Sequence, residues 1–125
     1  MKILIIDDSQ VVVDRLTEMI SELDDFNIVD SAACKMKGIE KFHELKPDVV
    51  ILDLQLERSN GIDVLLKIKK ESPSTIVIVL TNYPETYNRT ACLKAGANYF
   101  LDKSIEFEKV VDICGKLLLH FNNDK

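Results

Sequence analysis

The feature of this sequence that most constrains its fold is a set of short, continuous apolar runs rich in β-branched residues. They occupy residues 3–6, 49–52 and 76–80, and the last of them reads Ile-Val-Ile-Val-Leu. A strand that is apolar at every position is covered on both faces, which is typical of a parallel sheet. Residues 27–33 and 97–101 are weaker strand candidates, and we expect them at the edges of the same sheet.

Segments with the helical period separate these runs. Residues 36–45, 61–71 and 85–95 fit helices that end near Pro47, Pro73 and Gly96. Two further apolar stripes predict a first helix (Val12, Leu16, Met19, Ile20, Leu23) and a last one (Phe107, Val110, Val111, Cys114, Leu117, Leu118, Phe121). The fivefold alternation predicts an α/β fold with right-handed crossovers and one doubly wound, five-stranded parallel sheet with five helices. The helix at 85–95 has few apolar anchors, so we expect it to be the least firmly packed.

Composition and cysteine usage exclude several classes of protein. The chain has 125 residues, which fits one domain. Its net charge of −5 argues against non-specific electrostatic binding to nucleic acid. No apolar run is long enough to span a bilayer, so membrane insertion is not expected. The cysteines, Cys34, Cys92 and Cys114, are odd in number and form no Cys-x-x-Cys pair. Free thiols suit a reducing compartment, which predicts a cytoplasmic protein.

Polar residues follow the predicted strands at the positions where each strand ends. Asp7 and Asp8 follow the first strand, Asp53 the third, Thr81 the fourth, and Lys103 the fifth. Ligands of open α/β sheets bind beyond the carboxyl ends of the strands, so we expect these side chains to converge there. Alone, each of them would more often be a helix cap or a loop residue, and only their joint placement indicates a site.

Three close carboxylates would repel one another unless they held a proton or a cation. Hard oxygen ligands suit Mg²⁺, which accepts one or two carboxylates together with a phosphate oxygen. Lys103 offers a second positive charge and Thr81 a hydroxyl donor. A carboxylate in such surroundings can attack phosphorus, so the residues predict a magnesium site at which an aspartyl phosphate forms.

At these residues the sequence resembles a receiver domain of the two-component response regulators, of the single-domain kind found in chemotaxis. The resemblance covers nearly the whole chain. It is carried by Ile-Leu-Ile-Ile-Asp-Asp-Ser at 3–9, Val-Val-Ile-Leu-Asp-Leu at 49–54 followed by Gly61, Val-Leu-Thr at 79–81, and Ala-Gly-Ala-Asn-Tyr-Phe-Leu-Asp-Lys at 95–103. It implies a flavodoxin-like sheet with the strand order 2-1-3-4-5.

The resemblance also implies a role for each matched residue. Asp53 corresponds to the phosphoacceptor, and Asp7, Asp8, Asp53 and the carbonyl of Gln55 to the Mg²⁺ shell. Lys103 would pair with the phosphoryl group. Thr81 and Phe100 would be the switch residues, with Phe100 turning inward when Thr81 moves toward the phosphate. Gln55 and Tyr83 hold positions that border the attacking water, so we expect them to tune the lifetime of the phosphate. We expect Tyr83 to shield the acyl phosphate from that water. Packing of Tyr83 on the fourth helix is an equal alternative.

The sequence departs from the family pattern at four positions. Glu57 stands where a proline is frequent, and Asn82 where a small residue usually follows the switch threonine. Ser104 replaces a proline that usually follows the lysine after a cis peptide, which leaves the geometry of the 103–104 bond open. Phe100, unlike a tyrosine, has no hydroxyl to offer a partner.

The expected function is therefore that of a signalling receiver and not of an enzyme, although it promotes its own phosphorylation and dephosphorylation. The donor would be a histidine kinase or a histidine phosphotransfer protein, and the helix 4–strand 5–helix 5 surface would bind an unknown downstream protein. Because the chain ends at Lys125, directly after the fifth helix, we expect a single receiver domain over 1–125; a receiver fragment of a larger regulator would give the same sequence.

Three other functions compete with this interpretation. A phospho-independent receiver-like scaffold would tolerate loss of an acid or of the lysine, yet all are present. A haloacid dehalogenase-type phosphatase would carry Asp-x-Asp after the first strand, where this chain has Asp7-Asp8-Ser9. A flavodoxin-like flavin binder would need a Ser/Thr/Gly-rich loop there, because two aspartates repel phosphate without a metal.

Overall fold

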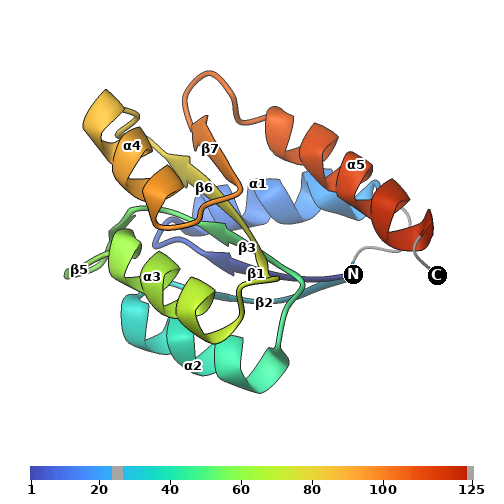
Figure 1. Cartoon of the computed structure of the whole chain (residues 1–125). Helices are drawn as coiled ribbons and strands as arrows, with labels where there is room; N and C mark the ends of the chain where they lie inside the picture. Colours follow the sequence, from blue (N-terminus) through green and yellow to red (C-terminus); the bar gives the residue numbers. More distant parts are fainter. Residues whose placement is uncertain (24–26, 124–125) are drawn as a thin grey trace.

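Five parallel strands form one sheet in the computed structural model, which describes residues 1–23 and 27–123. The sheet order is β2-β1-β3-β6-β7 (Figure 1). The strands are β1 (Lys2–Ile6), β2 (Asn27–Ala32), β3 (Val49–Leu52), β6 (Ile76–Thr81) and β7 (Tyr99–Asp102). This order confirms the predicted doubly wound fold, and it places the two weaker strand candidates at the sheet edges.

Helices cover both faces of the sheet (Figure 1). They are α1 (Gln10–Ser21), α2 (Lys35–Leu45), α3 (Gly61–Glu71), α4 (Thr86–Lys94) and α5 (Lys109–Asn123). Side chains of α1 and α5 share one hydrophobic cluster, and those of α2, α3 and α4 share the other. Within the described ranges, no helix combines the length and the apolar character that crossing a membrane requires.

The strand β1 shows why the apolar runs are continuous. Ile3 and Ile5 pack into the cluster of α1 and α5, whereas Leu4 and Ile6 pack into the cluster on the other face. Side chains alternate between faces along a strand, so a strand covered on both sides needs an apolar residue at every position. All four of these side chains are fully buried.

The structure refines three sequence-based predictions. In α1 Val13, which the predicted stripe omits, is buried, and Val12 packs partly buried against the same cluster. β7 begins at Tyr99, two residues later than predicted, because Ala97 N–H still donates to the Cys92 carbonyl of α4. Phe107 is buried, but it precedes α5 and does not belong to the helix stripe. The side chain of Phe121, the last residue of that predicted stripe, lies outside the described part.

The helix α4 buries a single residue, Cys92. By comparison, α1 and α3 bury three and four residues respectively. This agrees with the expectation that α4 is the most weakly packed helix, and a helix with few buried contacts is one that moves at low cost.

Candidate functional site

The three aspartates predicted to converge lie together at the carboxyl edge of the sheet. Asp7 directly follows β1 and Asp53 directly follows β3, and the pairing of Ile6 with Leu52 brings the two strand ends side by side. Asp7, Asp8 and Asp53 each offer a carboxylate oxygen, and these oxygens lie within 4.8 Å of one another. Asp7 and Asp53 are buried, at 5% and 6% exposure, whereas Asp8 faces solvent.

Lys103 reaches into this cluster from the end of β7. Its Nζ lies 2.8 Å from Asp7 Oδ2 and 3.1 Å from Asp53 Oδ2, and its side chain is only 9% exposed. The backbone N–H of Lys103 donates to the Thr81 carbonyl at 2.8 Å, which fixes the start of the loop. One buried ammonium thus holds two buried carboxylates from two different strands.

The second oxygen of each buried carboxylate is held by the backbone. Asp7 Oδ1 accepts from Ser9 N–H at 2.8 Å, and Asp53 Oδ1 accepts from Gln55 N–H at 3.2 Å. Ser9 is also the N-cap of α1 and accepts from Val12 N–H. The two carboxylates are therefore held in place by hydrogen bonds that the chain supplies locally.

Burial dominates the electrostatics of the cluster. It raises the pKa of Asp53 above its ordinary value, and the charge of Asp7 adds to this while Lys103 opposes it. Burial alone would lower the pKa of Lys103, but the hydrogen bond to Asp7 and the charges of Asp53 and Asp7 raise it overall. When all four groups are ionised, one ammonium does not balance three carboxylates, so an added cation would be attracted.

The donor set fits a magnesium ion. The cluster consists of hard carboxylate oxygens spaced closely enough to share one cation, and the exposed Asp8 makes no hydrogen bond or ion pair with another described residue. Mg²⁺ favours oxygen ligands and retains several waters, which an exposed ligand such as Asp8 permits.

Thr81 lies at the end of β6 and is fully buried. Its Oγ1 accepts from Tyr83 N–H at 3.1 Å. The hydroxyl proton of Thr81 is therefore not used in that bond and remains available to another acceptor. Thr81 thus lies on the same edge of the sheet as Asp53, without a direct hydrogen bond to it in this structure.

Phe100 is buried within the cluster of α2, α3 and α4. The guanidinium of Arg89, on α4, lies over its ring at 4.8 Å from the centroid. A cation over an aromatic face is attracted by the ring quadrupole. Sequence reasoning identified Phe100 but missed Arg89, because no pattern in the sequence links these two positions.

A small hairpin next to the phosphoacceptor candidate was also missed. The strands β4 (Gln55–Leu56) and β5 (Ser59–Asn60) pair antiparallel, with Glu57 and Arg58 in the turn and Arg58 at φ 58°. Two-residue turns need positive φ, and the absence of glycine or asparagine in this turn removed the usual hairpin signal. The departure at Glu57 therefore falls in an ordered turn.

Gly61 fits the site more tightly than the sequence suggested. A Cβ on Gly61 would collide with the carbonyl oxygen of Asp53 and lie 2.8 Å from Cα of Leu54. Its own N–H donates to the Leu54 carbonyl at 2.6 Å. The first residue of α3 therefore packs directly against the backbone of Asp53, and only glycine leaves room for it.

The loop after Lys103 adopts its form without a proline. No described peptide bond is cis, so the bond between Lys103 and Ser104 is trans. Ser104 donates from its N–H (2.9 Å) and from its hydroxyl (2.6 Å) to Asp102 Oδ1. Such side-chain hydrogen bonds stabilise turns, so Asp102 and Ser104 together restrain the segment that carries the lysine.

The sheet carries an acidic cluster with a lysine at its carboxyl edge, and the sequence that forms this arrangement matches a known protein family. Residues 3–114 match the family described as response regulator receiver domain. The chain belongs to this family, the receiver domains of two-component systems.

Individual relatives agree with this assignment. The response regulator protein VraR of Staphylococcus aureus is 30% identical over 115 residues, which are 92% of this chain and 55% of that protein. The response regulator domain of Thermotoga maritima CheB is 30% identical with a TM-score of 0.80, covering 98% of this chain and 94% of that one. CheY in the Borrelia burgdorferi CheX–CheY–BeF3–Mg²⁺ complex is 28% identical with a TM-score of 0.83, covering 94% and 88%. The chain spans about half the length of curated relatives such as VraR.

Proposed function

We propose that this receiver domain accepts a phosphoryl group on Asp53 from the phosphohistidine of a histidine kinase or histidine phosphotransfer protein. The observation that carries the proposal is the position of Asp53, which is buried between Asp7 and Lys103 at the carboxyl edge of the sheet. A buried carboxylate is costly, and a chain that places two of them around one lysine is typical of a functional site.

Asp53, Lys103 and Thr81 each have a separate role in the phosphoryl transfer. A carboxylate oxygen of Asp53 forms a bond to phosphorus while the bond from phosphorus to the donor imidazole nitrogen breaks. Lys103, already within hydrogen-bond reach, opposes the rise that burial causes in the pKa of Asp53 and offsets the charge of the incoming phosphoryl group. The Thr81 hydroxyl supplies a proton donor to a phosphoryl oxygen.

Asp7, Asp8, Asp53 and the carbonyl of Gln55 would hold the Mg²⁺ ion. Bound there, the ion would neutralise negative charge that builds up between the carboxylates and the phosphoryl oxygens. The magnesium and beryllofluoride named for the related CheY complex support this choice of ion.

The output surface is formed by α4, β7 and α5. Movement of Thr81 toward the phosphate changes the space beside Phe100. The helix that shifts in response is α4, because it buries only Cys92. An unknown downstream protein would bind this surface in the cytoplasm. Such a two-state element needs about 5.5 kcal/mol of differential stabilisation to pass from 1:99 to 99:1.

Tyr83 and Gln55 are proposed to set the lifetime of the phosphate. Both line a groove of about 490 Å³ beside the β4–β5 hairpin, and Tyr83 is 45% exposed there. A tyrosine in this position shields the acyl phosphate from water, so Tyr83→Ala should speed dephosphorylation. An unchanged rate would favour the alternative that Tyr83 only packs beside α4, where Asn88 Nδ2 donates to its carbonyl at 2.9 Å.

The test is phosphorylation with acetyl phosphate, with and without Mg²⁺, followed by intact mass and phosphate-affinity gel mobility. We expect an Mg²⁺-dependent gain of one phosphoryl group that is base-labile and is lost in Asp53→Asn. Asp63→Asn, on the exposed face of α3, is the matched control and should behave as wild type. A stable label on Asp53→Asn would refute the assignment, and absence of any label from both acetyl phosphate and a phosphohistidine donor would favour the phospho-independent scaffold.

A further inference from the structure

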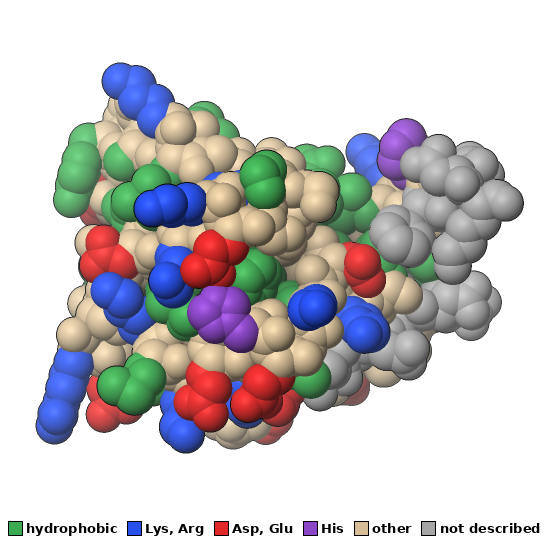
Figure 2. Space-filling view, turned by 60° about the horizontal axis from the view of Figure 1, so that its bottom comes forward, with side chains coloured by type: hydrophobic (Ala, Val, Ile, Leu, Met, Phe, Trp, Pro, Cys, Tyr) green, Lys and Arg blue, Asp and Glu red, His purple; other side chains and the backbone are tan. Residues whose placement is uncertain are grey.

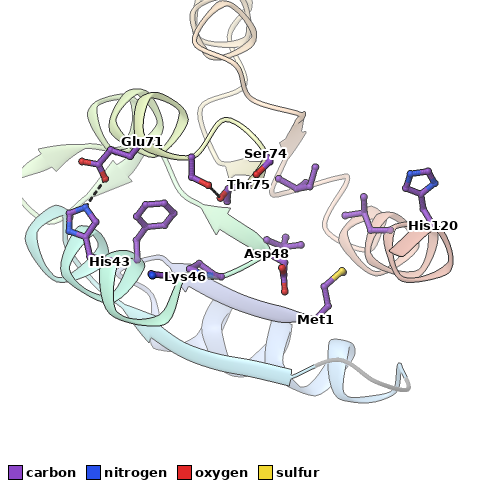
Figure 3. A pocket seen from close by; sticks show the side chains of 14 residues that line it. Met1, His43, Lys46, Asp48, Glu71, Ser74, Thr75 and His120 are labelled. Atoms are coloured by element: carbon purple, nitrogen blue, oxygen red, sulfur yellow. Dashed lines mark hydrogen bonds and ion pairs between the residues drawn. The ribbon is translucent and has the colours of Figure 1, made fainter. Parts of the chain in front are cut away.

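A cavity of about 650 Å³ lies at the amino-terminal edge of the sheet, at the opposite end of the strands from Asp53 (Figure 3). Its walls come from four places that are far apart in the sequence. They are Met1, the end of α2 with the segment leading into β3, the turn between α3 and β6, and the last turns of α5. The volume lies within the range of small-molecule sites, which is about 300–1,000 Å³.

The lining of this cavity is largely apolar. The side chains of Phe42, Pro47, Val49, Ile76 and Leu117 contribute to it. Val49 and Ile76 are the first residues of β3 and β6, so the cavity reaches the end of the sheet itself. An apolar lining of this extent favours a ligand with an aromatic or branched apolar body.

The acidic groups of the cavity already have partners. Glu71 accepts from His43 Nε2 at 2.6 Å and pairs with Lys67 at 3.1 Å, and the first of these pairs closes one side of the cavity in Figure 3. Asp48 Oδ2 accepts from the backbone N–H of Lys2 at 2.8 Å. The pairing holds the pKa of Glu71 below its ordinary value, through His43 first and Lys67 second.

The ammonium of Lys46 is different. Lys46 is exposed, caps the end of α2, and makes no side-chain hydrogen bond or ion pair with another described residue. On the face drawn in Figure 2, acidic, basic and hydrophobic side chains are mixed, without a broad area of one charge. Lys46 therefore offers a positive charge at the rim, next to an apolar interior, while the Asp48 carboxylate accepts from the Lys2 backbone N–H.

We propose that this cavity binds a small amphipathic organic anion, a carboxylate or sulfonate on an aromatic or branched apolar body. The apolar body would lie against Phe42, Ile76 and Leu117, and the anionic group would pair with Lys46. Nothing in this site uses Asp53, so binding is independent of phosphorylation chemistry and stands or falls separately from the proposed function.

The test uses 8-anilinonaphthalene-1-sulfonate, which combines an aromatic body with one anionic group, and its uncharged analogue N-phenyl-1-naphthylamine. Fluorescence titration should give one saturable sulfonate site per chain. Amide NMR shifts should map it to residues 42–49 and 72–76. Lys46→Gln should weaken the sulfonate about fivefold, as expected for a partly exposed ion pair, and leave the uncharged analogue unaffected.

Three further variants complete the experiment. Lys37→Gln removes the same charge from an exposed position nearer the start of α2 and should bind as wild type. Ser74→Trp places a large ring at the cavity wall and should abolish binding of both probes. Asp53→Asn should bind both probes unchanged. The proposal is overturned if no saturable site is found, if the amide shifts lie on α4 and β7, or if Lys37→Gln weakens the sulfonate as much as Lys46→Gln.

Discussion

Adding one methyl group at Gly61 should damage both the stability and the chemistry of this domain. The Cβ of alanine would collide with the carbonyl of Asp53 and press on the backbone of Leu54 at 2.8 Å. Because both neighbours are backbone atoms, neither can turn away as a side chain would, and the strand end or the start of α3 must shift. Overpacking of this kind costs about 1–3 kcal/mol, and we expect the upper part of this range.

The same shift would move the carboxylate of Asp53 away from Lys103. Misplacement of a reacting group by about 1 Å costs on the order of 10²-fold in rate. We therefore expect Gly61→Ala to lower the free energy of unfolding in urea by about 2–3 kcal/mol. Its phosphorylation by acetyl phosphate should slow more than tenfold.

Gly115 provides the matched control. It lies inside α5, and a Cβ built on it meets no atom within 4 Å. Gly115→Ala should therefore stabilise the protein by about 0.5–1 kcal/mol through the better helix propensity of alanine, with no change in phosphorylation. If Gly61→Ala unfolded and reacted like the wild type, the argument that this glycine positions Asp53 would be wrong.

The remaining predictions concern the thiols and α4. Burial raises the pKa of Cys114 to about 12, whereas an unfolded thiol ionises near 9.0, so the free energy of unfolding should fall as the pH rises from about 9 toward 12. Urea titrations should show that Cys114→Ala has a shallower alkaline slope than the wild type, and equal slopes would contradict the assignment. In native protein, iodoacetamide should label the partly exposed Cys34 first, with Cys92 and Cys114 modified only on unfolding; intact mass after timed quenching decides this. Arg89→Ala should cost about 0.5–1 kcal/mol through loss of the contact with the ring of Phe100 and should increase amide exchange in α4, and unchanged exchange there would show that this contact does not restrain the helix.

The sequence predicted the sheet well because its strands are covered on both faces. Continuous apolar runs at β1, β3 and β6 have few alternative interpretations, and their alternation with helices predicts a doubly wound parallel sheet. The strand order itself was implied by the family resemblance. The errors in the predicted strands occur where local hydrogen bonds determine the backbone conformation and the pattern of apolar residues does not. Ala97 continues the end of α4 and delays β7, and the hairpin at Gln55–Asn60 forms without the usual turn residues.

The candidate site was predictable for a similar reason. Asp7, Asp53 and Lys103 follow parallel strands directly, so topology alone brings them to one edge. The position of Gly61 against the Asp53 carbonyl and of Arg89 over Phe100 depends on how helices dock, which no periodicity encodes. The cavity at the opposite edge was missed because it is lined by helix ends and turns, where sequence patterns are weakest.

The alternation of side chains in β7 separates two neighbours along the chain. Phe100 belongs to the cluster beneath α2, α3 and α4, whereas Leu101 belongs to the cluster beneath α1 and α5. The sheet thus acts as a partition between two independent interiors. Under the proposed switch, rearrangement around Phe100 would be confined to one of them, and α1 and α5 would form a fixed base against which α4 shifts. A partner that contacts both α4 and α5 would then detect the displacement of α4 relative to α5.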